Sequence, residues 1–341
     1  MNYVIGELLH CSRLFRTDGA QVRQDAEGRP ALAPLAEGSP PLPVPEPLVE
    51  CARWRDTRRV PPVGAALWQL LNGAPPDAAA GRAYLRDLAR VQQSAGAFAL
   101  DLNVDGFSSD PAANGAALRA LVAAVQESVD LPLCIDSSSG DLLALGLSLV
   151  DPARPAPLLN SVSLSRFAEL EPLLSARSAR LRVVAAANDS DGSVPTDPDA
   201  RFRNLSELVG RLRSSGFPPD ALFLDPLVLP VCVGRTNGAS VLSLVRRLRD
   251  AFGPAIHFAP GLSNVSFGLP NRPLLNLAFA WLAREAGCDG AIADPRSIHT
   301  AALDAFRPDD PAAAAALRAL RGEDEDCLDY LESQRTGQPR A

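Results

Sequence analysis

The sequence contains no lysine: all 33 basic residues of the 341-residue chain are arginine. A chain without a lysine amine cannot form a Schiff base with a carbonyl substrate or attach pyridoxal phosphate. The chain is also short of positive charge as a whole, with a net charge of −7 and no strongly basic block. The composition therefore excludes Schiff-base chemistry and argues against nucleic acid or an anionic membrane as the main partner.

Histidine and cysteine are few and dispersed. Three histidines and six cysteines occur without a C-x-x-C pair. Because nothing has zinc-ligand spacing, we predict no metal site, and the unpaired cysteines predict a reducing, cytoplasmic setting. The N-terminal segment MNYVIGELLH has no basic stretch before a long apolar run, and no apolar run approaches the ~18 residues of a membrane span. We therefore expect neither a signal peptide nor association with a membrane.

Short apolar runs recur along the chain, each followed by a polar loop and then by a helical pattern. Buried parallel strands have this composition, and strand–helix alternation is typical of an α/β fold. The runs are residues 3–6, 97–104, 131–136, 157–163, 181–188, 221–229, 255–259 and 290–294. Eight such repeats predict a (β/α)8 TIM barrel that occupies residues 1–341 as a single domain.

One connection breaks this rhythm, because about ninety residues separate the first two runs. Its proline-rich part, EGRPALAPLAEGSPPLPVPEPLVE, predicts a long insertion between strands 1 and 2, at about residues 16–81. We expect an extended loop or flap, serving as an ordered cover or a partner surface, and then a helix over 82–96. At the other end, the variable acidic C-terminal tail, about residues 320–341, is expected to be a solvated helix or tail.

Polar residues stand where the predicted strands end, which is where barrel enzymes place their chemistry. They are Glu7, Asp101, Asn103, Asp105, Asp136, Ser137, Asn160, Ser161, Asn188, Asp189, Asp225, Ser263, Asn264 and Asp294. Carboxylates and amides of this kind suit a flat neutral heterocycle with several N–H donors and ring acceptors. A single aspartate before a helix is more often an N-cap, so the functional interpretation depends on the recurrence of these residues over alternate strands.

Seven segments of the sequence resemble the pterin-binding methyltransferases that move a methyl group between methyltetrahydrofolate and a corrinoid protein. They are IGE (5–7), DLNV (101–104), LCIDS (133–137), LNSVS (159–163), FLDPLVLP (223–230), GLSNVSFGLPNRPLLN (261–276) and GCDGAIADP (287–295). The FLDPLVLP and GLSNVSFGLPNR segments are the most specific, and the resemblance covers nearly the whole chain apart from the insertion and the tail.

The resemblance implies a role for individual residues. Asp136, Asn160 and Asp225 match the positions that hold the pterin ring, and Asn264 matches the amide beside N5, the methyl-bearing nitrogen. We predict that Asn264, Asp136 and Asp225 are catalytic, with N5 activated by hydrogen bonding or protonation. The wider pterin and folate set also contains Glu7, Asn103, Asn188, Gly261, Ser263, Ser266 and Arg272.

The chain departs from the family pattern in its first loop. Where the family has E-R-x-N after strand one, this chain has Glu7, Leu8, Leu9 and His10. His10 either replaces a lost contact or is structural. In the loop after strand five, a basic position has become Asp189.

Two expectations concern the start of the helix that follows strand seven. Asn271 is expected to cap this helix, which Pro273 begins. Arg272 either lies beside the folate carboxylates or belongs to this helix start.

Three other activities compete with methyl transfer. Dihydropteroate synthase shares the barrel but uses a lysine and an Asn-Val-Thr-Pro loop, which this chain lacks. Complete methionine synthase needs a zinc thiolate site and an Asp-x-His-x-x-Gly cobalamin motif, which are also missing, so the cobalamin or other corrinoid must arrive on a separate protein. A non-catalytic pterin or folate scaffold is the third alternative. The resemblance also implies a homodimer.

Overall fold

The computed structural model of the chain describes residues 1–336, which fall into two compact units. Unit 1 comprises Met1–Ile5 and Asn160–Ala341, and unit 2 comprises Gly6–Leu159. The two boundaries cut strands β1 (Tyr3–His10) and β9 (Leu158–Val162), so each of these strands contributes residues to both units. No helix in the described range combines the length and the apolar character that crossing a membrane requires.

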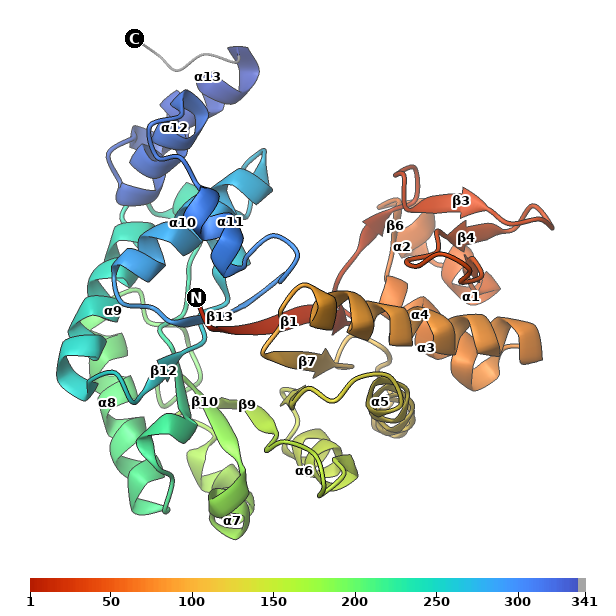
Figure 1. Ribbon diagram of the computed structural model, residues 1–341, viewed down its shortest axis with the longest axis horizontal. Coiled ribbons are helices and arrows are strands. Elements are labelled where there is room, and N and C mark those ends of the chain that lie inside the picture. Colours follow the sequence, from red (N-terminus) through yellow and green to blue (C-terminus); the bar gives the residue numbers. More distant parts are fainter. Residues whose placement is uncertain (337–341) are drawn as a thin grey trace. The chain divides into compact units, whose positions relative to one another are not determined.

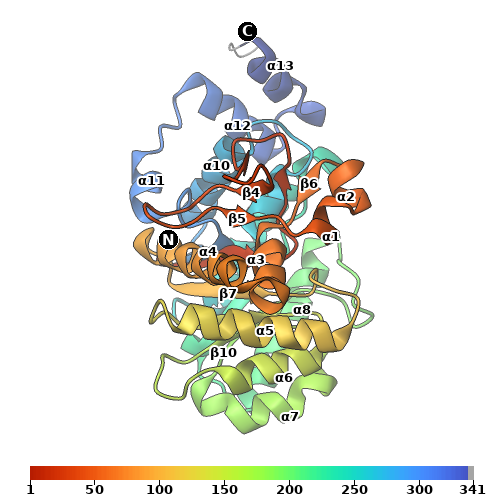
Figure 2. The same ribbon diagram turned by 90° about the vertical axis from the view of Figure 1, so that its right-hand side faces the viewer.

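Unit 2 contains the strands and helices of the first barrel repeats. β7 (Ala99–Asn103) pairs in parallel with β8 (Leu133–Asp136), in a register that sets Asn103 opposite Asp136. The helices of these repeats are α4 (Pro75–Ser94), α5 (Pro111–Gln126) and α6 (Gly140–Leu149). α5 and α6 lie side by side (Figure 2). The register brings the last residues of β7 and β8 together, which positions the site residues of this unit.

Unit 1 contains the remaining repeats. Its strands after β9 are β10 (Arg182–Ala186), β11 (Leu222–Asp225), β12 (His257–Phe258) and β13 (Gly290–Ala293). Its α-helices are α7 (Phe167–Arg177), α8 (Pro198–Ser214), α9 (Asn237–Phe252), α10 (Arg272–Glu285), α11 (Thr300–Ala305), α12 (Pro311–Arg321) and α13 (Leu328–Thr336). Figure 1 shows how helix follows strand through this unit, from green to blue.

The eight parallel strands form one sheet in the order β12-β11-β10-β9-β8-β7-β1-β13. Within unit 1, a parallel bridge between Gly261 and Ile292 joins the two ends of this order. The strand interiors are apolar and buried, as a sheet covered on both faces requires. The predicted (β/α)8 barrel is confirmed: seven of the predicted runs contain a strand each, and β1 begins in the first run, 3–6, but continues to His10.

The prediction of one extended loop before residue 82 is wrong. A three-stranded antiparallel sheet is formed by β3 (Val22–Gln24), β4 (Pro30–Leu32) and β5 (Leu42–Pro43), and β2 (Phe15–Arg16) pairs with β6 (Arg59–Val60). The helices are α1 (Glu46–Val49), α2 (Ala52–Arg55) and α3 (Pro62–Asn72), and α4 starts at residue 75 rather than 82. Of the prolines in the quoted segment, Pro30 and Pro43 lie in strands β4 and β5, and Pro47 lies in the first turn of α1, where a missing N–H costs nothing.

The acidic C-terminal segment is helical, as predicted, but it is not a fully solvated helix. Tyr330 of α13 is fully buried, and its hydroxyl donates to the carbonyl oxygen of Pro270 at 2.9 Å. Asp324 is also buried and accepts the backbone N–H groups of Asp329 and Tyr330. One face of this helix is therefore anchored to unit 1, while residues 337–341 of the predicted tail lie outside the described residues.

Candidate active site

The strand-end carboxylates and amides of unit 2 are joined by hydrogen bonds. The Asn103 Nδ2 donates to Asp136 Oδ2 at 2.8 Å, while its Oδ1 accepts the backbone N–H of Asp105 at 3.0 Å. Asp105 in turn accepts the Ser137 hydroxyl at 2.5 Å and the Ser138 backbone N–H at 2.7 Å. The loops after β7 and β8 are thus linked, and Asn103 acts on Asp136 directly.

His10, the last residue of β1, lies against two of these carboxylates. Its Nε2 is 3.1 Å from Oδ2 of Asp101 and 4.0 Å from Oδ2 of Asp136. The Asp101 side chain is fully buried, and that of His10 is 14% exposed. Each of the three residues has one potential metal-ligand atom, and these atoms lie within 4.8 Å of one another. The imidazole already has Asp101 as its ion-pair partner, so we assign no metal to the group. The group is therefore a buried cluster of two carboxyls and one imidazole.

Burial and charge change the acidity of this cluster. Burial, reinforced by the charge of Asp101, raises the pKa of Asp136 to about 7, while His10 and the Asn103 hydrogen bond act against this rise. Burial lowers the pKa of His10, but Asp101, Asp136 and Glu7 together outweigh it, so the pKa of His10 is raised from its ordinary value. Glu7 also accepts the Arg13 guanidinium at 3.1 Å. Asp136 therefore titrates near neutral pH.

In unit 1, the candidate pterin-binding residue Asp225 ends β11 and is supported by a buried arginine. Its Oδ1 accepts the backbone N–H of Leu227 at 2.8 Å. Arg201 of α8 is 1% exposed and donates to the carbonyl oxygens of Pro195 at 2.6 Å and Leu227 at 2.9 Å. Burial raises the pKa of Asp225 to about 6, and the Leu227 hydrogen bond and Arg201 act against this rise. Leu227 has a φ of 59°, a conformation that the surrounding hydrogen bonds hold.

The turn η4 (Leu262–Ser266) carries Asn264, with Gly261 as its N-cap residue. Arg272 crosses this turn: its Nε donates to the Ser266 hydroxyl at 3.0 Å and its Nη2 to the Ser263 carbonyl at 2.8 Å. The guanidinium also lies over the ring of Phe267, 4.3 Å from its centroid. Arg272 begins α10, and these contacts also make it a brace on the Asn264 turn; its place beside the folate carboxylates stays a prediction.

The expected side-chain cap of α10 is not formed. Asn271 is the N-cap residue, but it has a φ of 48° and its side chain makes no capping hydrogen bond. Its Nδ2 donates instead to Gln334 of α13 at 3.0 Å. The positive φ directs the side chain away from the helix N–H groups, and Pro273 still stands in the first turn as predicted.

The remaining strand-end residues of unit 1 hold their loops. The Asn188 amide donates to the Gly192 carbonyl at 3.2 Å, and Asp189 accepts the amide of Asn204 at 2.8 Å. Asp294 is paired with Arg296 at 2.7 Å. Asn160, predicted to stand at a strand end, is instead the half-buried middle residue of β9. The pterin roles predicted for Asn160 and Asn188 stay predictions.

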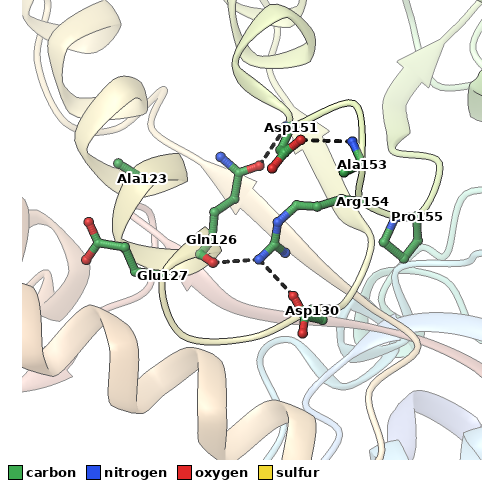
Figure 3. Close-up of a pocket in the computed structure, with 8 residues that line it drawn as sticks. All are labelled: Ala123, Gln126, Glu127, Asp130, Asp151, Ala153, Arg154 and Pro155. Carbon is green, nitrogen blue, oxygen red and sulfur yellow. Dashed lines mark hydrogen bonds and ion pairs between the residues drawn. The ribbon is translucent and has the colours of Figure 1, made fainter.

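A cavity of about 620 Å³ in unit 2 lies away from all of these residues (Figure 3). Arg154 crosses it and donates to the carbonyl oxygens of Gln126 and Val129, while Gln126 accepts the backbone N–H of Asp151 at 2.8 Å. The cavity lies beside the chain segments that enter β8 and β9, at their amino ends. Polar groups at that end of a barrel serve stability rather than chemistry, and these hydrogen bonds fasten one loop to another.

Sequence reasoning missed Arg201 and left His10 undecided. Arg201 lies three residues inside a helix, surrounded by other arginines of the segment RFRNLSELVGRLR, and no spacing distinguishes the buried guanidinium from the exposed ones. For His10, the signal was present: it follows the first apolar run, at a position where the resemblance implied an asparagine.

The chain belongs to the family of pterin binding enzymes, whose model matches residues 82–294. It is 30% identical over 257 residues to the methylcorrinoid:tetrahydrofolate methyltransferase of Eubacterium limosum, covering 75% of this chain and 88% of that protein. It is also 30% identical over 228 residues to the methionine synthase of Mycobacterium tuberculosis, but there the match spans only 18% of the longer protein. Within the family, the chain is thus an enzyme of the methyltransferase group.

Solved structures support the same fold. A dihydropteroate synthetase determined with a product superposes with a TM-score of 0.53 at 16% identity, covering 67% of this chain and 88% of that chain. The dihydropteroate synthase of Stenotrophomonas maltophilia superposes with a TM-score of 0.50 at 17% identity, covering 67% and 87%. At these identities the likeness shows the barrel alone.

Proposed function

We propose that this enzyme moves the N5-methyl group between methyltetrahydrofolate and the cobalt of a separate corrinoid protein. The observation that carries the proposal is the placement of Asp136 and Asp225. Each is the last residue of a barrel strand, and burial raises the pKa of each toward neutrality. Perturbed carboxyls at the carboxyl ends of barrel strands are typical of a functional site.

The side chains fit a reduced pterin in their chemistry. The amino-pyrimidinone edge of a pterin offers N–H donors, which ionised Asp136 and Asp225 can accept. The amide of Asn160 can donate and accept at once. With these residues, binding relies on placed hydrogen bonds and needs no lysine, which agrees with a chain whose only basic side chains besides histidine are arginines.

The chemical step requires help at N5. When the methyl group leaves methyltetrahydrofolate, the electron pair of the N5–carbon bond stays on nitrogen, and the electron pair of cobalt(I) forms the new bond to the methyl carbon. N5 is a poor leaving group unless it is protonated. Asn264 is a neutral amide and cannot supply the proton itself, so its proposed role is to accept a hydrogen bond from protonated N5 and stabilise that form.

The partner and the assembly are part of the same proposal. The name of the Eubacterium limosum relative contains both a methylcorrinoid and tetrahydrofolate. Since the sequence contains no cobalamin motif, the corrinoid would be presented by another protein. By resemblance to the family, we expect a homodimer in the cytoplasm.

The test follows the oxidation state of cobalt. Purified protein is mixed with methyltetrahydrofolate and either cob(I)alamin or a reduced corrinoid protein, and the loss of the cobalt(I) absorbance is recorded. Calorimetry with methyltetrahydrofolate alone measures binding separately. Transfer supports the proposal; binding without transfer to every carrier tried would select a non-catalytic folate scaffold instead.

Formation of dihydropteroate from a pterin pyrophosphate and p-aminobenzoate would select a synthase, the activity of the structural neighbours. The lack of lysine argues against that outcome.

A further inference from the structure

His10 ends β1, at a position where the resemblance implied an asparagine, and its imidazole is a group that can carry charge. An asparagine amide can donate a hydrogen bond to a carboxylate, but it cannot neutralise one. An imidazolium does both. The consequence depends on what surrounds the imidazole.

The groups whose charges act on His10 are all acidic. Glu7 comes from its own strand, Asp101 from β7 and Asp136 from β8. Farther out, Asp105 acts on Asp136, and the buried thiol of Cys134 lies beside both aspartates. Among these groups, His10 is the cation nearest to the two carboxyls, 3.1 Å from Asp101 and 4.0 Å from Asp136. Arg13 is engaged by Glu7 instead.

Asp101 and Asp136 would repel each other if both were ionised without a cation between them. Both are withdrawn from water, with exposed side-chain fractions of 0% and 24%. Two carboxylates that share a buried site normally hold one proton between them. A charged imidazole next to both removes the need for that proton.

We propose that His10 is a positioning residue for the pterin site: its imidazolium, placed between Asp101 and Asp136, keeps Asp136 ionised so that it can accept the N–H donors of the pterin edge. The inference rests on the proposed function, because it assigns Asp136 to the pterin. Its structural part, a charged His10 that acts on Asp136, stands without it.

The pKa directions agree with this role. His10 is among the groups that lower the pKa of Asp136, against the upward effect of burial and of Asp101. Asp101 raises the pKa of His10 in return. Replacement of His10 by a neutral residue would therefore leave Asp136 protonated over more of the neutral range.

The first experiment measures the charge of His10 in the wild-type protein. The chain has only three histidines, so the imidazole NMR signals of ¹⁵N-histidine-labelled protein can be assigned with the His10→Asn and His299→Asn variants. The His10 signal should titrate above the pH of an ordinary histidine, about 6.5. A His10 signal that is neutral at pH 6 would overturn the inference, and this readout requires neither folate nor turnover.

The second experiment measures the dissociation constant of methyltetrahydrofolate from pH 5.5 to 8.5 for the wild type, His10→Asn and the control His299→Asn. His299 is a matched control because it caps α11 in unit 1. We expect His10→Asn to bind methyltetrahydrofolate about tenfold more weakly than the wild type at pH 6.5, and with nearly the wild-type affinity at pH 8.5. This is the effect expected if the pKa of Asp136 rises by about one unit in the variant.

A merely structural role for His10 would weaken binding equally at every pH, and that result would overturn the inference. If the wild type binds no folate at any pH, the proposed function fails, while the NMR titration still decides whether His10 is charged.

Discussion

The buried guanidinium of Arg201 donates to the carbonyl oxygen of Leu227 at 2.9 Å, two residues beyond Asp225 in the chain. The same guanidinium binds the carbonyl of Pro195 at 2.6 Å, in the loop after β10. One side chain thus fastens the loops of two adjacent strands, and it also acts electrostatically on Asp225. The position of a candidate pterin carboxylate therefore depends on a residue that no motif singled out.

Replacement of Arg201 by methionine should destabilise the protein and weaken folate binding together. The variant leaves buried carbonyl groups without their donor, which should lower the free energy of unfolding by on the order of 2–4 kcal/mol, since hydrogen bonds of charged groups contribute about 1.5–3 kcal/mol each. Urea denaturation measures the loss. Arg203→Met is the matched control, because that side chain is 69% exposed and should change stability little. Equal stabilities of the two variants would contradict the proposal that Arg201 fastens the loops after β10 and β11.

Folate affinity should rise with pH between about 5.5 and 7.5 and then level off. Asp136, with a pKa of about 7, and Asp225, with a pKa of about 6, must be ionised to accept the pterin N–H groups. Binding near pH 6.5 should therefore release protons, which calorimetry in two buffers of different ionisation enthalpy measures. Asp136→Asn should bind more weakly and release fewer protons, whereas Asp130→Asn, altered at a side chain that is 95% exposed, should resemble the wild type. Proton uptake on binding would contradict the assignment.

The ligand-free protein should lose stability over much of the same range. A carboxyl whose folded-state pKa exceeds its unfolded value of about 3.9 holds its proton longer in the folded state. Its contribution to stability is therefore complete below that unfolded value and declines as pH rises toward the folded pKa. Asp136 and Asp225 both have this sign, so the free energy of unfolding should fall between about pH 4 and pH 7. Denaturation curves of Asp136→Asn should show a shallower decline than those of the wild type.

Asn264→Ala should reduce methyl transfer far more than it affects folding. Removal of one placed hydrogen-bonding group from a site of charge development typically costs about 10²–10³ in rate. Single-turnover transfer from methyltetrahydrofolate to cob(I)alamin measures the effect, and thermal unfolding checks the fold. Asn72→Ala, on an exposed part of α3, serves as the control. If Asn264→Ala transfers the methyl group at the wild-type rate, the role proposed for Asn264 at N5 is wrong.

Two roles are possible for Arg272, and a substrate without the glutamate tail distinguishes them. If it braces the η4 turn through Ser263 and Ser266, Arg272→Ala should slow transfer about equally for methyltetrahydrofolate and for a methylated tetrahydropterin without the glutamate tail. If it binds the folate carboxylates, only the complete substrate should lose affinity. We expect the first result, with a rate loss of up to about thirtyfold, because Arg272→Ala removes two hydrogen bonds of about 1 kcal/mol each.

The strand pattern was predictable because buried parallel strands must be apolar, and short apolar runs recur eight times in alternation with helical patterns. Register was not. The pairing of Asn103 opposite Asp136 places an amide donor on the carboxylate, and nothing in either segment fixes that alignment. The sequence therefore located the ends of β8 and β11 correctly, whereas β1 runs past Glu7 to His10 and Asn160 lies inside β9. It could not say which polar side chains would hold one another and which would face a ligand.

Prolines misled the prediction of the segment before residue 82. Pro30 and Pro43 lie in short strands and Pro47 lies in the first turn of a helix, although prolines at this density have the sequence signature of a loop. The short strands β3, β4 and β5 have two or three residues each, too few for an alternating pattern to be recognised. Buried Arg201 was missed for a different reason, because only the tertiary structure distinguishes it from exposed arginines of the same helix.

Helix α3, which lies within the expected loop, packs closely on α4, and a single methyl group should test that packing. A Cβ on Gly81 of α4 would lie 2.4 Å from the Ala66 carbonyl oxygen of α3, a backbone atom that cannot move aside by a rotamer change. Alanine normally favours a helix over glycine by about 1 kcal/mol, but overpacking of this kind costs about 1–3 kcal/mol. Gly81→Ala should therefore destabilise the protein in urea. Gly210→Ala is the matched control: it lies in α8 with nothing within 4 Å, so the same change should stabilise the protein by about 0.5–1 kcal/mol. Opposite signs for the two variants would establish the close approach of α3 and α4, and a stabilised Gly81→Ala would disprove it.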